Sequence, residues 1–223
     1  AFTGDWAADA ARRDFTFNAL YCDAGGAVHD PLGGYPDLVA RRVRFVGDPD
    51  QRIAEDYLRI LRFFRFHAQF GCGDPDRAAC AAAIRGRLGL ARLSAERVRA
   101  ELLKLLVAPR AIDGITAMMD CGLLPALTGA APRPGVLASV VAAEARVGVV
   151  PDAVLRLSAL SVAVEEDRTR IAERLRLSNA ERSDLIVIDG QLCRQFTGLD
   201  ARAARRSEEH TSELQSPYVI SYA

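Results

Sequence analysis

The sequence predicts an α+β protein in which a short mixed segment precedes a longer all-helical part. Signals for β-structure occur only in residues 1–48: a Gly-Gly turn between two β-compatible runs, and then an alternating segment. From residue 49 onwards, apolar residues recur at helical spacing and no further strand is predicted. A chain of 223 residues, half of them apolar, is long enough to bury a substantial core.

The first part of the chain is rich in residues that begin or end secondary structure. Alanines at residues 7–11 favour a helix, and Gly25-Gly26 favours a tight turn. Proline and glycine after Asp30 favour a loop. The elements expected here are a helix at 5–20, hairpin strands at 20–23 and 27–30, a loop at 30–37 and a strand at 42–46.

The rest of the chain alternates amphipathic runs with short breaks, as helical bundles do. Ser94 and Ser178 stand at positions typical of N-caps, and Gly71 and Gly73 end the first long run. The helices expected are 53–70, 76–87, 94–106, 109–124, 131–149, 152–164, 166–175 and 179–192.

Composition excludes several classes of protein. The formal net charge is zero, so no global electrostatic signal favours nucleic acid. Lys104 is the only lysine; arginine suits planar contacts to phosphate, but a high-GC genome explains the bias more simply. The five cysteines and three histidines form neither a CxxC pair nor a zinc pattern, which favours reduced thiols and a cytoplasmic location. No apolar run approaches the ~20 residues of a membrane span, and the first residues lack the pattern of a signal peptide.

One charged block, Glu55-Asp56-Tyr57-Leu58-Arg59, falls within the first long helix expected. On a helix Asp56 and Arg59 are i,i+3 neighbours, and by itself such a pair is an ordinary surface ion pair. A carboxylate beside a guanidinium also offers an acceptor next to a donor. Cytosine and adenine present the complementary groups on their Watson–Crick edges, whereas guanine and uracil present the reverse order. The pair is therefore a candidate for selecting C and A over G and U without a template.

Two more arginines, Arg62 and Arg65, continue this block at three-residue steps and are candidates for a cationic stripe facing triphosphate or RNA. The same helix carries many apolar residues. Phe63 and Phe66 are therefore expected in the core rather than as base-stacking platforms. His67 is expected to be a structural histidine with satisfied hydrogen bonds rather than a ligand.

An earlier block, Arg12-Arg13-Asp14-Phe15-Thr16-Phe17-Asn18-Ala19, places Asp14 and Asn18 one turn apart on the expected helix. A carboxylate and an amide so placed are candidates for holding ribose hydroxyls, while Arg12 or Arg13 reaches phosphate oxygens. By themselves these residues also suit a charged helix terminus. The segment between the two blocks, DPLGGYPDL at 30–38, has the composition of an ordinary loop.

The order and spacing of RRDFTFNA, DPLGGYPDL and EDYLR together resemble a known family. This family is the template-independent nucleotidyltransferases, namely the bacterial class II CCA-adding tRNA enzymes and poly(A) polymerases. The run LSAERVRAELLKLL resembles the family's neck helix, and Gly122-Leu123-Leu124 resembles a motif of its body. The resemblance covers about residues 5–106, with weaker helical similarity to about 205.

This resemblance implies a division of the chain into parts. Residues 1–48 would be the C-terminal part of a nucleotidyltransferase head, 49–110 a helical neck that recognises the base, and 111–205 a helical body that binds RNA. Residues 206–223 lack the Ala- and Arg-rich bias of the rest, and their back-translation resembles a sequencing-adapter oligonucleotide. We expect them to be adapter read-through rather than native protein, although a genuine polar tail is the rival interpretation.

The resemblance also implies a chemistry: addition of CCA to tRNA 3′ ends from CTP and ATP. Asp14 and the neighbouring arginines would contact ribose and phosphates, and Asp56 and Arg59 would read the base. The loop at 30–38 would help position the nucleotide as specificity changes from C to A. The family's Mg²⁺ ions are held by a DxD pair of carboxylates upstream of RRDxxxNA, before Ala1. We therefore expect no catalytic residue on this chain and weak nucleotide binding without catalysis.

Other functions remain open at this stage. A poly(A) polymerase shares the same three blocks. A non-catalytic helical RNA-binding or scaffold module would carry these charges without any nucleotide dependence. A metal-dependent phosphohydrolase is disfavoured because the sequence has only one His-Asp pair, His29-Asp30, and its three histidines complete no metal-ligand pattern. The start at Ala1, without an initiator methionine, suggests a piece of a longer protein, and nothing in the sequence fixes the oligomeric state.

Overall fold

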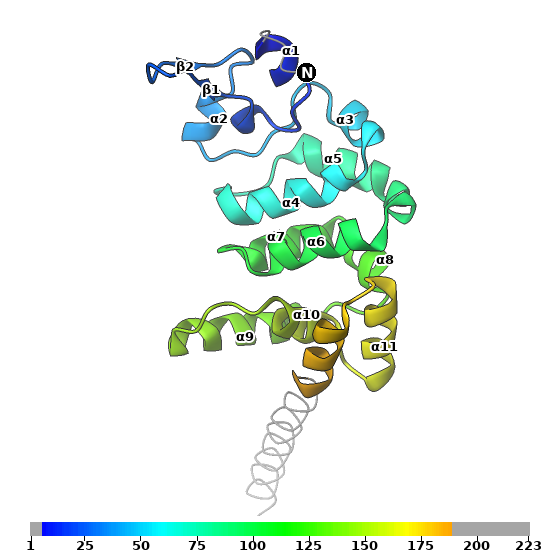
Figure 1. Ribbon diagram of the computed structural model, residues 1–223. Helices are drawn as coiled ribbons and strands as arrows, with labels where there is room; N and C mark the ends of the chain where they lie inside the picture. The colour runs from blue at the N-terminus through cyan, green and yellow to red at the C-terminus, as the bar shows by residue number, and fades with distance from the viewer. Residues whose placement is uncertain (1–5, 189–223) are drawn as a thin grey trace, which may run out of the picture.

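A computed structural model describes residues 6–188, in which layers of helices stack beneath a small N-terminal β-hairpin (Figure 1). The elements are α1 (Trp6–Ala10), the 3₁₀ helix η1 (Thr16–Asn18), β1 (Tyr21–Cys22), β2 (Val28–His29), α2 (Tyr35–Val39), α3 (Pro49–Glu55), α4 (Leu58–Phe70), α5 (Arg77–Gly86), the 3₁₀ helix η2 (Arg87–Arg92), α6 (Ala95–Leu106), α7 (Ala111–Asp120), α8 (Leu124–Thr128), α9 (Pro134–Val147), α10 (Ala153–Ser161) and α11 (Glu165–Arg174). A last helix begins at residue 179 and continues to the end of the described range. The predicted fold class, a small α/β segment followed by helices, is confirmed.

The predicted β-hairpin is present. β1 pairs with β2 in antiparallel register, with Tyr21 opposite His29. The carboxylate of Asp23 accepts hydrogen bonds from the backbone amides of Gly25 and Ala27, each at 2.9 Å, and thereby closes the turn. Gly26 has a φ of +85°, which a residue with a side chain rarely adopts.

The single helix expected at 5–20 is wrong. α1 ends at Ala10, and Phe15 lies in extended backbone that forms a β-bridge with Phe45. The Phe15 side chain is fully buried, and its ring lies 4.9 Å from that of Phe45, so burial of this aromatic pair outweighs the local helix preference. The strand expected at 42–46 is reduced to this bridge. The loop expected at 30–37 contains the start of α2.

The long helix expected at 53–70 is two helices. α3 ends at Glu55, and α4 begins at Leu58. Asp56 between them is extended, with φ −155° and ψ 109°, so the chain bends there. We call residues 55–59 the elbow.

The later helices begin at side-chain caps, of which Ser94 and Ser178 were predicted. Asp76 accepts a hydrogen bond from Ala79 N at 2.9 Å at the start of α5, and Ser94 accepts one from Arg97 N at 3.4 Å at the start of α6. Ser178 accepts a bond from Glu181 N, and Glu181 accepts one from Ser178 N, which together form a capping box. The 3₁₀ helix η2 and the five-residue α8 were not expected because such short elements show no periodicity.

The core runs continuously through the helical layers. α4 packs against both α6 and α7, and the rings of Phe63 and Phe64 are fully buried in it. Phe66 packs at the edge of the same core, which agrees with the expectation that Phe63 and Phe66 are core residues. Among residues 6–188 no helix is both long and apolar enough to cross a membrane.

Candidate nucleotide-binding site

The elbow brings Asp56 and Arg59 close together in the chain but pairs each of them with another residue. Arg97 on α6 donates from Nη2 to Asp56 Oδ2 at 2.6 Å. Arg59 forms an ion pair with Glu55 and donates to the carbonyl of Arg52 at 2.8 Å. The direct Asp56–Arg59 pair expected from helical spacing is therefore absent, because Asp56 lies outside the helix that carries Arg59.

The electrostatic surroundings keep both carboxylates of the elbow ionised. Burial of Asp56 opposes its charged form, but hydrogen bonds from Arg97 and from Leu58 N outweigh it and lower the pKa. Hydrogen bonds from Arg59 and then Arg52 lower the pKa of Glu55. Near neutral pH each group is therefore only an acceptor of hydrogen bonds.

The structure joins the first sequence block to the helix that follows the elbow. Arg62 on α4 forms an ion pair with Asp14, which lies 48 residues earlier in the chain. The carbonyl of Asp14 also accepts a hydrogen bond from Val46 N at 3.0 Å. The guanidinium of Arg62 lies 5.5 Å from the centre of the Phe66 ring, a cation–π distance. Two of the predicted site residues thus meet, although the sequence placed them in separate blocks.

The other residues of the first block take different positions. Asn18 ends η1 and accepts a long hydrogen bond from Phe15 N at 3.4 Å, so it does not share a helical face with Asp14 as predicted. Arg12 and Arg13 both pair with Asp9, at 3.6 and 2.9 Å. The Arg12 side chain is 65% exposed, which leaves it the freer of the two to reach a ligand.

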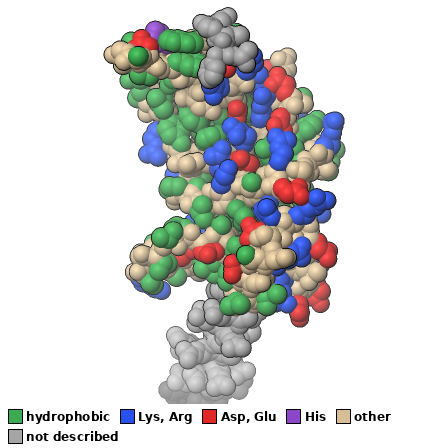
Figure 2. All heavy atoms as spheres, viewed as in Figure 1, with side chains coloured by type: hydrophobic (Ala, Val, Ile, Leu, Met, Phe, Trp, Pro, Cys, Tyr) green, Lys and Arg blue, Asp and Glu red, His purple; other side chains and the backbone are tan. Residues whose placement is uncertain are grey.

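The prediction of a cationic stripe is wrong for Arg65. Its side chain is buried, donates to Glu101 at 2.6 Å and to Gln69 at 3.0 Å, and lies 3.9 Å from the centre of the Phe66 ring. Arg65 thus links α4 to α6 through its ion pair with Glu101 and is not part of the solvent-exposed surface. Across the face shown in Figure 2, basic side chains are interleaved with acidic ones.

Sequence reasoning missed a buried carboxylate beneath the first block. Asp37 is 2% exposed; it accepts a hydrogen bond from the Thr16 hydroxyl at 2.6 Å and pairs with Arg44 at 2.8 Å. Gly34 allows the loop that carries Asp37 to approach Thr16, because a Cβ at Gly34 would lie 2.1 Å from the carbonyl oxygen of Thr16. The Gly-Gly pair of DPLGGYPDL was the available signal, since it marks a close approach of two backbones.

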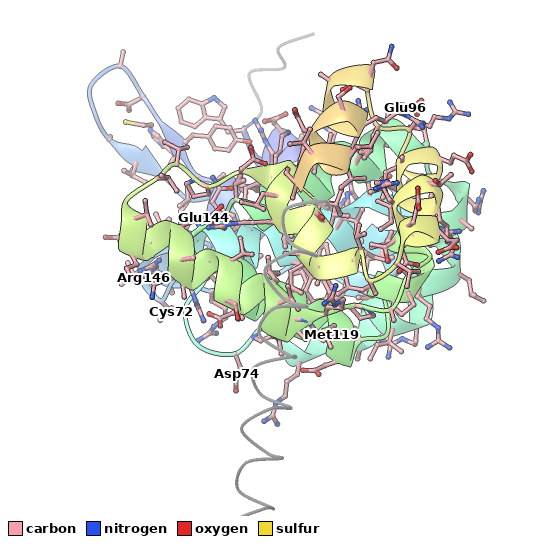
Figure 3. All side chains as sticks on the ribbon, turned by 90° about the horizontal axis from the view of Figure 1, so that it is seen from below. Cys72, Asp74, Glu96, Met119, Glu144 and Arg146 are labelled. Carbon is pink, nitrogen blue, oxygen red and sulfur yellow. The ribbon has the colours of Figure 1, made fainter. Side chains whose placement is uncertain are left out.

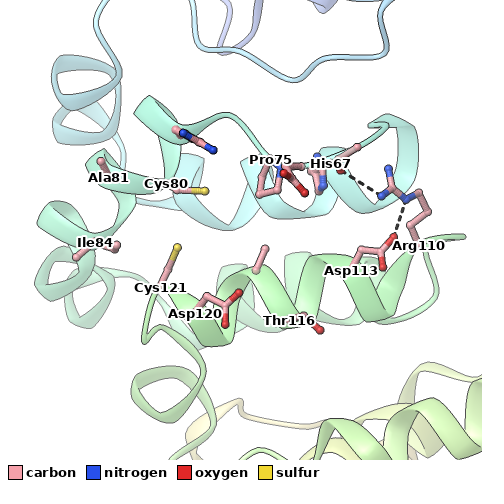
Figure 4. Close-up of a pocket in the computed structure, with 14 residues that line it drawn as sticks. His67, Pro75, Cys80, Ala81, Ile84, Arg110, Asp113, Thr116, Asp120 and Cys121 are labelled. Atoms are coloured by element: carbon pink, nitrogen blue, oxygen red, sulfur yellow. Dashed lines mark hydrogen bonds and ion pairs between the residues drawn. The ribbon is translucent and has the colours of Figure 1, made fainter.

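A separate hollow of about 740 Å³ lies between the end of α4, α5 and α7 (Figure 4). His67 lines it, is 2% exposed, and has a pKa lowered by burial. The expectation of a buried structural histidine is right, but the predicted hydrogen bonds to its ring are not found among residues 6–188, where the side chain lines the hollow. Arg110 and Asp113 at the rim pair with each other at 2.7 Å.

The thiol of Cys80, which also lines this hollow, is expected to resist alkylation. Burial and the neighbouring Cys121 raise the pKa of Cys80 to about 12, so almost no thiolate is present at pH 8. Treatment with iodoacetamide at pH 8, followed by peptide mass spectrometry, should label the exposed Cys22 and Cys72 first. In urea, where the protein is unfolded, Cys80 should be alkylated at the same rate as Cys22 and Cys72. Equal labelling of Cys80 and Cys22 in the folded protein would contradict this.

Two family models match parts of the chain. The model described as the poly A polymerase head domain matches residues 1–44. The model described as the probable RNA and SrmB-binding site of polymerase A matches residues 78–131. The elbow lies between the two matched segments.

Curated relatives are similar over much of the chain. The human protein named CCA tRNA nucleotidyltransferase 1, mitochondrial, is 37% identical over 185 residues, which are 82% of this chain and 42% of the relative. A CCA-adding enzyme of Geobacillus thermodenitrificans is 38% identical over 128 residues, 56% of this chain and 31% of the relative. The chain thus spans less than half the length of these relatives.

Solved structures share the fold. The CCA-adding enzyme of Bacillus stearothermophilus in complex with CTP has a TM-score of 0.67 at 30% identity, covering 86% of this chain and 48% of that one. The Thermotoga maritima enzyme complexed with tRNA has the same TM-score at 21% identity, covering 88% and 51%. At the lower identity the likeness shows the fold alone.

Proposed function

Since the chain belongs to the family of CCA-adding tRNA nucleotidyltransferases and poly(A) polymerases, we propose that it forms the nucleotide-holding part of an enzyme that adds CCA to tRNA 3′ ends from CTP and ATP. The ion pair between Asp14 and Arg62 carries this proposal, because it brings the first sequence block beside the elbow. The relatives named above are CCA-adding enzymes, so the poly(A) polymerase alternative is not favoured. The cytoplasmic location remains a prediction.

All of the predicted site residues except Arg65 keep a role in this proposal. Asp14, Asn18 and the exposed Arg12, with Arg13 beside it, would contact ribose and phosphates. Asp56 would accept a hydrogen bond from the amino group of cytosine or adenine, while Arg59 donates to the neighbouring ring nitrogen. For Arg59 to do so, its guanidinium turns from the carboxylate of Glu55, which is half exposed. Arg65 has no part, because Glu101 and Gln69 already occupy it.

The proposed division of the chain keeps its predicted boundaries. Residues 1–48 form the end of the head, 49–110 the neck and 111–205 the body. This assignment is supported by α4 lying beneath the N-terminal part of the chain that carries the β-hairpin (Figure 1). Residues 189–205 of the proposed body and the proposed adapter-derived segment 206–223 lie outside the described residues.

The family implies Mg²⁺ held by paired carboxylates. Within residues 6–188 no group of three or more His, Cys, Asp or Glu side chains is placed to hold a metal ion. The described residues thus offer no cluster of ligands for the ion, and we assign them no metal-dependent step. We propose that this chain holds nucleotide without joining it to RNA.

This proposal predicts binding without incorporation. Titrating ¹⁵N-labelled protein with CTP should shift amide resonances of the elbow and of residues 12–19. Incubation with tRNA lacking CCA, labelled CTP, ATP and Mg²⁺ should leave the tRNA unextended. An Asp56→Ala variant serves as the control for binding at the elbow.

The outcomes separate the alternatives. Extension of the tRNA would overturn the proposed inactivity. Titration without any nucleotide-dependent shift would overturn the nucleotide site and favour a non-catalytic RNA-binding module.

A further inference from the structure

We propose that the hollow between the end of α4, α5 and α7 binds a linear aliphatic polyamine, with one ammonium group near His67, another near Asp120 and the methylene chain between them. The hollow has a volume of about 740 Å³, and none of the residues assigned to the nucleotide lines it. The inference therefore goes beyond the proposed function and does not depend on it.

The charged side chains of the hollow leave an excess of negative charge. Three carboxylates and two guanidinium groups line it, those of Asp74, Asp113, Asp120, Arg77 and Arg110. Arg110 is already engaged, because it pairs with Asp113 at 2.7 Å and donates to two backbone carbonyls in the loop after α4, at 2.7 and 3.3 Å. The side chains of Asp74 and Asp120 form no ion pair or hydrogen bond within residues 6–188. The hollow therefore attracts a cation.

A buried imidazole at one end of the hollow offers a hydrogen-bond acceptor. The His67 side chain is 2% exposed, and no hydrogen bond to its ring is found among residues 6–188. Burial and then the field of Arg110 lower the pKa of His67, so near neutral pH one ring nitrogen carries no proton. An ammonium group can donate to this nitrogen, whereas an ionised phosphate or carboxylate has no proton to give it. Asp74, whose field reaches His67, supplies the negative charge at this end.

Carboxylates stand at both ends of the hollow. Asp113 and Asp120 are seven residues apart on α7, which places them on one face of the helix and about 10 Å apart along its axis. Figure 4 shows Asp113 beside Arg110 at one end and Asp120 beside Cys121 at the other. Much of the remaining lining is apolar and comes from Pro75, Ala81, Ile84 and Ala117.

These features together select the class of ligand. Two separate places for a cation, joined by an apolar surface, match a methylene chain that carries an ammonium group at each end. A nucleotide is disfavoured, because its phosphates would meet the excess of carboxylates. A metal ion is disfavoured as well, because within the described part of the chain no three His, Cys, Asp or Glu side chains converge to hold one.

Calorimetric titration of the whole chain with spermidine, at constant ionic strength, tests the proposal. Putrescine, whose two ammonium groups lie closer together, should bind more weakly, and butylamine, with a single ammonium group, more weakly still. Asp120→Asn should weaken spermidine binding about three- to fivefold, the effect of losing one exposed charge pair. Glu173→Gln removes an exposed carboxylate on α11 that does not line the hollow, and it should leave the affinity unchanged.

NMR locates the ligand, because spermidine in the hollow should shift the ring resonances of His67. If circular dichroism shows that Asp120→Asn is unfolded, Asp74→Asn provides the same comparison. Equal weakening by Asp120→Asn and Glu173→Gln would mean a general attraction of surface carboxylates for cations, and would overturn the proposal. No measurable binding of spermidine, or unaltered His67 resonances at saturation, would overturn it too.

Discussion

Replacing Gly89 with alanine is expected to destabilise the protein by about 1–3 kcal/mol and to weaken CTP binding at the same time. Gly89 is buried in η2, and an added Cβ would lie 2.1 Å from Cδ1 and Cε1 of Tyr57. These atoms belong to a rigid ring, so relief requires movement of the whole side chain or of the elbow backbone. Because Tyr57 is joined directly to Asp56, that movement displaces the carboxylate proposed to read the base.

Gly135→Ala is a matched control for this substitution. Gly135 lies in α9, is exposed, and has nothing within 4 Å of the position of a Cβ. Alanine there should leave stability unchanged or raise it by about 0.5–1 kcal/mol, because glycine weakens a helix. Urea unfolding of both variants, with CTP titration of each, gives the comparison. Equal stability and equal CTP affinity for the two variants would contradict the role assigned to Gly89.

Local chemistry predicted most of the helical part. Ser94 and Ser178 were recognisable as caps because the side-chain acceptor and the amide it satisfies lie three residues apart. The hairpin was predictable for the same reason, since Gly25-Gly26 carries its own turn geometry. These features depend only on neighbours in the chain.

Features that depend on distant residues were not predictable. Periodicity through residues 53–70 suggests one helix, and the break at Asp56 becomes understandable only once Tyr57 is seen packing on Gly89. Likewise, Arg65 resembles the other arginines of its helix until Glu101 is placed beside it.

In the candidate site, too, the residue types could be predicted from the local sequence but their distant partners could not. The residue types in the three blocks indicated nucleotide chemistry, but their partners came from elsewhere in the chain. Arg97 lies in the run LSAERVRAELLKLL, which resembles the neck helix, but nothing in the sequence paired it with Asp56. Asp14 and Arg62 were each proposed as nucleotide ligands, and their contact with each other implies that binding requires both to exchange partners. The ion pairs that the site residues form with one another in this structure are therefore set by the fold and not by the local sequence.

The largest loss of stability is expected from Arg156→Met, at about 3–5 kcal/mol. Arg156 on α10 and Glu144 on α9 are both almost fully buried and pair through two short contacts, of 2.6 and 2.7 Å (Figure 3 labels Glu144). Arg156 also donates to the carbonyl of Leu106 at the end of α6 at 2.6 Å, so a single side chain ties α10 to both α9 and α6. Methionine fills similar space but leaves a buried carboxylate and a buried carbonyl without this donor.

A double-mutant cycle separates this charge effect from lost packing. Glu144 accepts a hydrogen bond from the backbone amide of Asp152 at 3.1 Å, and Glu144→Gln keeps an oxygen that can accept the same bond. The double variant has no unpaired buried charge. Its loss in free energy of unfolding, measured in urea, should therefore be clearly smaller than the sum of the losses of the two single variants. Arg85→Ala, which breaks an exposed pair with Asp50, should change stability little. Additive losses in the cycle would mean that Arg156 acts by packing alone, and the contact joining α6, α9 and α10 would then owe its strength to shape rather than to charge.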